Sequence, residues 1–240
     1  MNKTWTRIVI VVIAAAAVAF WVFFDRQRAP ERQMDNALNA MPAWQVIKEQ
    51  EPALHQRILD QMAALQKAGE PEQQIIDTIQ PQILHLQMSR LQNAPDANVV
   101  NYMTINMEQT AAIQKVSDDA CFRFLYPMVK GGVNPMRMLD KDLMARRMQA
   151  DAEMMRAAYG KNRHTVTPGE REAAVEDVRP IMKQLTDKYG EDIQLLQMPE
   201  KAAGKEKLSC DMVQEMWAKV LALPEQKAAG VIRLAVSELE

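Results

Sequence analysis

The side chains that most often bind metals are few and scattered in this chain of 240 residues. None of the three histidines, His55, His85 and His164, has a metal-binding partner three or four positions further along. Helical metal sites use that spacing, because such residues share one face of a helix. A phosphate-binding glycine-rich loop and a G-x-S-x-G elbow are also missing from the sequence. We therefore expect neither a metal site nor a cofactor.

Methionine is unusually frequent, with 18 residues, and soft thioether ligands favour Cu(I). Three pairs are spaced by four residues: Met103/Met107, Met144/Met148 and Met212/Met216. Each pair falls within the apolar pattern of a predicted helix, and no nearby histidine or cysteine completes a cluster. We expect these side chains to fill the core. The second interpretation is an adaptable binding surface, since methionine repacks around different apolar partners.

Carboxylates are the remaining candidates for catalysis. Asp118 and Asp119 open a predicted helix, where the helix dipole favours negative charge, so a capping role explains them. The other acidic residues of this region are expected at solvated helix positions: Glu108, Asp140, Asp142, Asp151 and Glu153. A cell-wall lytic enzyme with a single catalytic glutamate needs no local motif, but aromatic residues to line a sugar cleft make up just 5% of the chain. The sequence therefore favours a protein that is not an enzyme.

The two cysteines, Cys121 and Cys210, form an even set that suits one disulfide in an oxidising compartment. The alternative is a pair of buried free thiols. If bonded, they close a loop of about 90 residues, for which the chain-entropy model gives at most about 4–5 kcal/mol.

The stretch from residue 117 to residue 135 holds the densest cluster of aromatic residues, beside one of the cysteines and two glycines. A loop next to a disulfide-tied helix is expected to be rigid and exposed, as a binding site requires. The candidate partner-binding residues are Phe122, Phe124, Tyr126, Lys130 and Asn134. In the competing interpretation the two phenylalanines belong to the core.

An apolar run near the amino terminus bears on the cellular location of the protein. Residues 8–24 form 17 positions without a charge, and Trp5 and Trp21 lie near the two ends, where indoles prefer the membrane interface. A cleaved signal peptide would end in small residues, whereas here bulky Phe23 and Phe24 follow the alanines. We therefore expect an uncleaved transmembrane anchor.

The domain prediction has three parts: residues 1–24 as cytoplasmic tail and anchor, 25–41 as a juxtamembrane linker, and 42–240 as a helical body. Lysines and arginines flank the run about equally, so the positive-inside rule does not decide the orientation. A short basic tail is easily retained in the cytoplasm, and the cysteine pair suits the periplasm. The predicted location is the bacterial inner membrane, crossed once by residues 8–24, with the body in the periplasm.

Helix signals punctuate the body, and no convincing strand pattern occurs in it. The prediction is an all-α fold, a bundle or superhelix of roughly eight to ten helices. Prolines at positions 81 and 180 should kink or split the helices that contain them. The expected boundaries are a helix between Pro52 and Gly69, one from Asp96 to about Val116, one capped by Ser117, one from Asn134-Pro135 to Tyr159, one opened by a Thr167/Glu170 capping box and ending at Gly190, one capped by Ser209, and one started by Pro224.

The charge pattern bears on the class of partner. A net charge of -2 argues against nucleic acid, and the basic run of Arg137, Lys141, Arg146 and Arg147 is interleaved with acidic residues, as on a salt-bridged face. We expect a non-enzymatic interaction module that binds another envelope protein as a scaffold, regulator or immunity-type binder, with no small-molecule substrate. The alternative is a membrane-tethered periplasmic chaperone or foldase with a Met-rich groove. The layout resembles that of membrane-tethered steric foldases, without their sequence motif.

Overall fold

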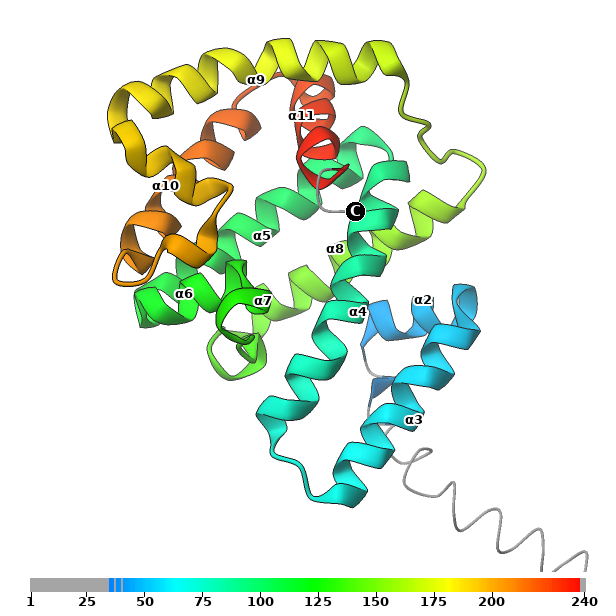
Figure 1. Ribbon diagram of the computed structural model, residues 1–240. Coiled ribbons are helices and arrows are strands. Elements are labelled where there is room, and N and C mark those ends of the chain that lie inside the picture. Colours follow the sequence, from blue (N-terminus) through cyan, green and yellow to red (C-terminus); the bar gives the residue numbers. More distant parts are fainter. Residues whose placement is uncertain (1–34, 37, 40, 238–240) are drawn as a thin grey trace, which may run out of the picture.

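The structure, a computed structural model, describes residues 35–36, 38–39 and 41–237 (Figure 1). This part of the chain contains ten α-helices, three 3-10 helices and no strand, which confirms the all-α prediction. The α-helices are α2 (Pro42–Gln50), α3 (Pro52–Ala68), α4 (Glu72–Asn93), α5 (Asp96–Val116), α6 (Asp118–Leu125), α7 (Pro127–Lys130), α8 (Lys141–Tyr159), α9 (Pro168–Tyr189), α10 (Glu206–Leu221) and α11 (Glu225–Ser237). The 3-10 helices are η1 (Pro135–Arg137), η2 (Gly190–Leu196) and η3 (Pro199–Lys201).

The predicted anchor, residues 8–24, lies outside the described residues, as does most of the predicted linker. Within the described ranges, none of the helices combines the length and the apolar character that a membrane crossing demands. The anchor therefore stays a prediction.

Several helix ends lie where their capping residues predict them. Helix α3 begins at Pro52 and ends before Gly69, whose φ of 74° is the left-handed conformation of a helix C-cap. Helix α5 has the predicted bounds, and the Ser117 hydroxyl caps α6 by accepting the Ala120 N–H at 3.2 Å. The internal prolines at positions 81 and 180 leave α4 and α9 as single helices.

The predicted helix from Asn134 to Tyr159 is wrong as one element. The Asn134 side chain caps a 3-10 turn by accepting the Met136 N–H at 3.1 Å, and that turn ends at Arg137. Asp140, expected at a solvated position within the helix, is instead the N-cap of α8 and accepts the Leu143 N–H at 2.8 Å. Two N-capping side chains six positions apart start two separate elements, because each satisfies free backbone N–H groups at the beginning of its own helix.

Two further predicted caps differ from the structure, that of α10 wholly and that of α9 in one half. Ser209 does not cap α10, which begins at Glu206, and instead lies fully buried inside that helix. Thr167 caps α9 as predicted, since its hydroxyl accepts the Glu170 N–H at 3.2 Å. The Glu170 carboxylate, however, accepts from His164 at 2.7 Å and from Arg233 at 2.9 Å. Tertiary ion pairs thus replace the second half of the capping box.

The helices pack around α5 and α8. Helix α5 contacts α6, α8, α10 and α11, and α8 also contacts α2 and α4, while α3 forms an antiparallel hairpin with α4 (Figure 1). The main core collects residues from most helices, and a second apolar cluster surrounds the two cysteines. Of the three predicted methionine pairs, two have one buried member each, Met103 and Met212, which lie in these clusters. Both members of the third pair, Met144 and Met148, are half-buried.

Buried charges join helices that are distant in sequence. Arg233 on α11 is just 2% exposed and donates to the Asp96 carboxylate at 2.7 Å, to Glu170, and to the Ala94 carbonyl oxygen at 2.7 Å. The expectation of a solvated Asp151 is wrong: it is buried in an ion pair with Arg147 at 2.8 Å. These two residues are one turn apart on the inner side of α8, so each neutralises the other there.

The other arginines of the predicted salt-bridged face pair with acidic residues of other helices. Arg137 pairs with Glu72, and Arg146 pairs with Glu108 at 2.6 Å.

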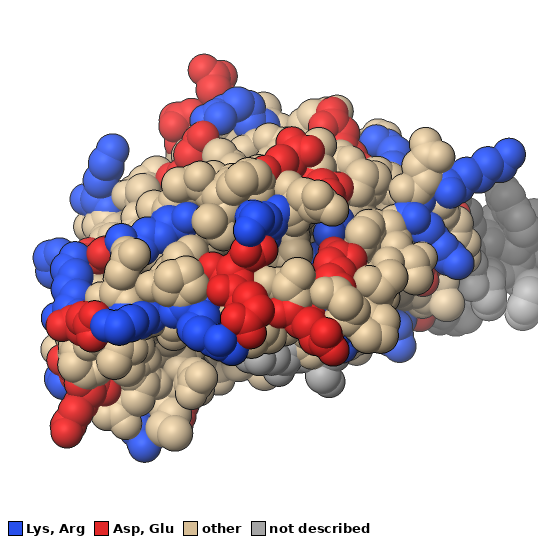
Figure 2. Space-filling view, turned by 90° about the horizontal axis from the view of Figure 1, so that it is seen from above, with Lys and Arg blue, Asp and Glu red and all other residues tan. Residues whose placement is uncertain are grey.

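Figure 2, which views the molecule from the side of α9, shows Lys and Arg interspersed with Asp and Glu over the α9 face. Charges of both signs mixed in this way are typical of a solvated surface.

Candidate functional site

The predicted binding stretch folds into helix α6 and, after it, most of a loop, residues 126–137, that we call the α7 loop. It contains α7 and η1, and α7 lies between α6 and α4 (Figure 1). Pro127 opens α7, because a proline is suited to the first turn of a helix, where its missing N–H has no partner to lose. Gly131 ends α7 with φ 77° and ψ 152°, a conformation that is essentially restricted to glycine.

The second glycine permits close contact between the loop and α4. A Cβ atom on Gly132 would lie 2.0 Å from Oε1 of Gln80 and 3.3 Å from a methyl carbon of Ile76. Any side chain at this position would therefore displace the Gln80 amide. The two glycines thus have different roles, since Gly131 turns the chain and Gly132 lets its backbone lie against the helix.

Hydrogen bonds hold this glycine pair on both sides. The Gly132 N–H donates to Oδ1 of Asp77 at 3.1 Å, and Gln73 Nε2 donates to the Gly132 carbonyl oxygen at 3.0 Å. Arg123 of α6 donates to the carbonyl oxygens of Gly131 at 3.2 Å and Gly132 at 2.6 Å. The backbone polar groups of the turn are therefore bound to α4 and α6, which fixes the position of the loop.

Ion pairs and a cap support the two ends of the loop. Lys130 donates to Asp119 of α6 at 2.5 Å and to Glu206 of α10 at 3.0 Å, and these hydrogen bonds raise the pKa of Lys130. Asn134 donates to Glu72 of α4 at 2.9 Å. Because these groups are largely solvated, each pair is weak and serves mainly to select one arrangement.

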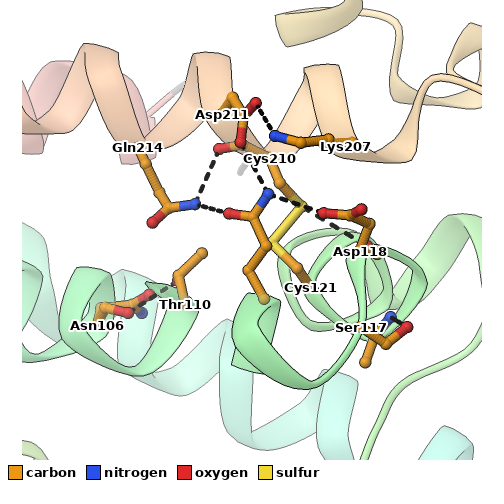
Figure 3. The surroundings of a disulfide bond; sticks show 11 residues. Asn106, Thr110, Ser117, Asp118, Cys121, Lys207, Cys210, Asp211 and Gln214 are labelled. Atoms are coloured by element: carbon orange, nitrogen blue, oxygen red, sulfur yellow. Dashed lines mark hydrogen bonds and ion pairs between the residues drawn. A yellow bond between two sulfur atoms is a disulfide. The ribbon is translucent and has the colours of Figure 1, made fainter. Parts of the chain in front are cut away.

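The disulfide predicted between Cys121 and Cys210 is confirmed, and it supports the loop from beneath. It joins α6 to α10 with 6.4 Å between the Cα atoms, and both cysteines are fully buried. Figure 3 shows Asp118, Asp211 and Gln214 beside it. Gln114 Nε2 joins this polar network by donating to Asp118 at 3.0 Å and to Asp211 at 2.8 Å. Covalent and polar contacts therefore hold α6, which directly precedes the α7 loop, against α10.

The five candidate partner-binding side chains contact other residues of the same chain. Phe122 is buried, its ring 5.1 Å from that of Tyr126, and Phe124 and Tyr126 pack half-buried on the same cluster. Lys130 and Asn134 take part in the contacts that support the loop. Binding of a partner by these five residues stays a prediction. Phe122 belongs to the core, as the competing interpretation expected.

Three of the solvent-exposed side chains on the α7 loop are apolar residues that the sequence did not single out. Met128 is 76% exposed, Val129 41% and Met136 56%, and all three belong to the α7 loop. A sequence signal was present: α7 is a single turn bounded by a proline and two glycines, too short to bury all of its apolar residues. Exposed large apolar side chains on a fixed backbone are suited to contact with another protein.

A shallow pocket of about 250 Å³ lies where the α7 loop meets α4. Its apolar walls are Pro81 of α4 with Pro127 and Met128 of α7, and its polar lining comes from Asp77, Gln80 and the two glycines. In the described part of the chain, no three His, Cys, Asp or Glu residues are grouped so as to hold a metal ion.

Comparison with protein-family models, with curated proteins and with solved structures finds no match to this chain.

Proposed function

We propose that this protein is a membrane-anchored, non-enzymatic interaction module that binds one partner protein through the α7 loop. Residues 8–24 anchor it in the bacterial inner membrane, and the helical body lies in the periplasm. The partner is another envelope protein, which the module holds, regulates or neutralises.

The exposure of Met128, Val129 and Met136 carries this proposal. Most large apolar side chains of the described residues are wholly or partly buried, whereas these three lie on one loop with its backbone already hydrogen-bonded to α4 and α6. A loop that is ordered before binding loses little conformational entropy on association. Methionine is enriched at interfaces and adapts its shape to an apolar partner.

The disulfide supports the proposed location. Disulfides persist in oxidising compartments such as the periplasm and are rare in the cytosol. Cys121 and Cys210 belong to the body, so a body in the periplasm agrees with an anchor whose short basic tail remains in the cytoplasm.

Site-specific photocrosslinking in intact cells tests the proposal. A photoreactive amino acid replaces Val129 on the α7 loop, and in a matched control it replaces Val175 on α9, which is equally exposed at 42%. We expect one discrete adduct from position 129 and none of that size from position 175. Adducts with many unfolded envelope proteins would support a chaperone instead, and equal labelling from both positions would refute the assignment of the loop.

A further inference from the structure

The pocket beside the α7 loop combines an apolar wall with a single carboxylate. Pro81, Pro127 and Met128 supply the apolar surface, and Asp77 is the one charged residue among those that line the pocket. The pocket has a volume of about 250 Å³.

The hydrogen bonds of Asp77 engage one of its two oxygens. Oδ1 accepts from Gln73 at 2.8 Å and from the Gly132 N–H at 3.1 Å, which fixes the orientation of the carboxylate. Within the described residues Oδ2 accepts no hydrogen bond and Asp77 forms no ion pair. The neighbouring acidic residues differ, since Glu72 is paired with Arg137 and Asp119 with Lys130.

Arg123, the basic side chain that contacts this turn, forms its hydrogen bonds with other groups. Arg123 donates to the carbonyl oxygens of Gly131 and Gly132 and to the Gln73 amide oxygen at 3.3 Å. It therefore holds the turn in place and leaves the second oxygen of Asp77 free. An oriented carboxylate at an apolar pocket favours a cation with an aliphatic stem, since the stem buries apolar surface while the charged end pairs.

We propose that this pocket receives a lysine or arginine side chain of the partner. Its methylene groups pack on Pro127 and Met128, and its charged end binds Oδ2 of Asp77. This inference rests on the proposed function and specifies the chemistry of the partner: a basic residue placed next to an apolar contact surface.

The probe is N-acetyl-arginine amide, and the matched control ligand is the uncharged isostere N-acetyl-citrulline amide. We expect the arginine ligand to shift the NMR signals of the Met128 methyl group and the Gly132 amide in a saturable way. The citrulline ligand should bind about tenfold more weakly, because charge-assisted hydrogen bonds are roughly twice as strong as neutral ones. Equal shifts from both ligands, or no saturable shift from arginine, would overturn the proposal.

Two variants separate a charge effect from a loss of structure. Asp77→Asn keeps an oxygen that can accept the Gly132 N–H, so the loop should remain folded while arginine affinity falls about tenfold. Asp187→Asn on α9 removes an equivalent charge far from the pocket and should leave the affinity unchanged.

The two proposals fail separately. If Val129 crosslinks to one partner but the arginine ligand does not bind, the partner site stands and the cation pocket is refuted. If the arginine ligand binds and no crosslink forms, the pocket stands and the proposed partner function fails.

Discussion

Removing the disulfide should cost this protein a large part of its stability. In the chain-entropy model the cross-link removes about 2.1 plus 1.5R ln n cal/mol/K of unfolded-state entropy. The cysteines are 89 positions apart, so at room temperature the model gives about 4–5 kcal/mol. Folded domains are typically stable by about 5–15 kcal/mol, so the double variant Cys121→Ala/Cys210→Ala should be marginally stable.

Urea unfolding followed by circular dichroism measures this effect. The oxidised protein, the protein in excess reductant and the double variant are compared, and non-reducing gel mobility reports the bond itself. In a thermal unfolding experiment on a body of this size, the same loss of free energy lowers the melting temperature by roughly 8–20 °C. Reductant should have no effect on the double variant, which controls for nonspecific effects of the reagent.

Two results would refute the reasoning. If oxidised protein and double variant unfold at the same urea concentration with the same slope, the bond does not constrain the unfolded chain. If protein purified from cells under thiol-blocking conditions has free cysteines, the argument that places the body in the periplasm fails as well.

Three further predictions concern single residues. Gly132→Ala should shift the NMR signals of the α7 loop and destabilise the protein by no more than about 1 kcal/mol, because the new methyl group would lie 2.0 Å from Oε1 of Gln80 and that flexible side chain must turn away. Burial raises the pKa of Asp35, but hydrogen bonds from Lys48, Trp44 and His55 outweigh it and lower the pKa from 3.8 to about 2. The carboxylate therefore contributes about 2 kcal/mol to the free energy of unfolding above pH 4, and this contribution is lost as the pH falls through 2. Asp35→Asn should therefore lose this amount at neutral pH and flatten the acid limb of the stability curve measured by urea unfolding. Arg233→Met should lower the unfolding free energy by about 3 kcal/mol, because it leaves Asp96 and Glu170 without their cation.

Control variants accompany these measurements. Gly169→Ala on α9 has open space around its missing Cβ and should change stability by less than about 0.5 kcal/mol. Asp60→Asn, on the exposed side of α3, should leave the pH dependence as it is in the unaltered protein. A Gly132→Ala protein with unchanged loop signals would show that the loop does not lie against α4 as described.

Local signals were sufficient for much of the fold. The bounds of α5 and the start of α3 follow from residues within one turn of each end, as do the caps by Ser117 and Thr167. The disulfide was also predictable, because the chain contains just one possible pair. These features depend on neighbouring residues or on counting, which a sequence displays directly.

Two of the errors have a common cause. Glu170 was expected to bond its own helix cap but instead binds Arg233, which is 63 positions away. Asp151 was expected in solvent but lies on the side of α8 that packs against other helices. In both cases contacts with distant parts of the chain decide the outcome, and no local pattern specifies those contacts.

The candidate site shows the same division. Composition and spacing pointed to the stretch around Cys121, and Gly131 and Gly132 indicated a turn there. Which side of the stretch faces solvent was decided by its docking on α4, α6 and α10, so Phe122 is buried while Met128 is exposed. The sequence by itself determined most of the helices, because short-range forces govern them, and the cysteine pair, because the chain holds just two cysteines. The tertiary structure alone decided which residues are presented to a partner, because burial is set by contacts between distant segments.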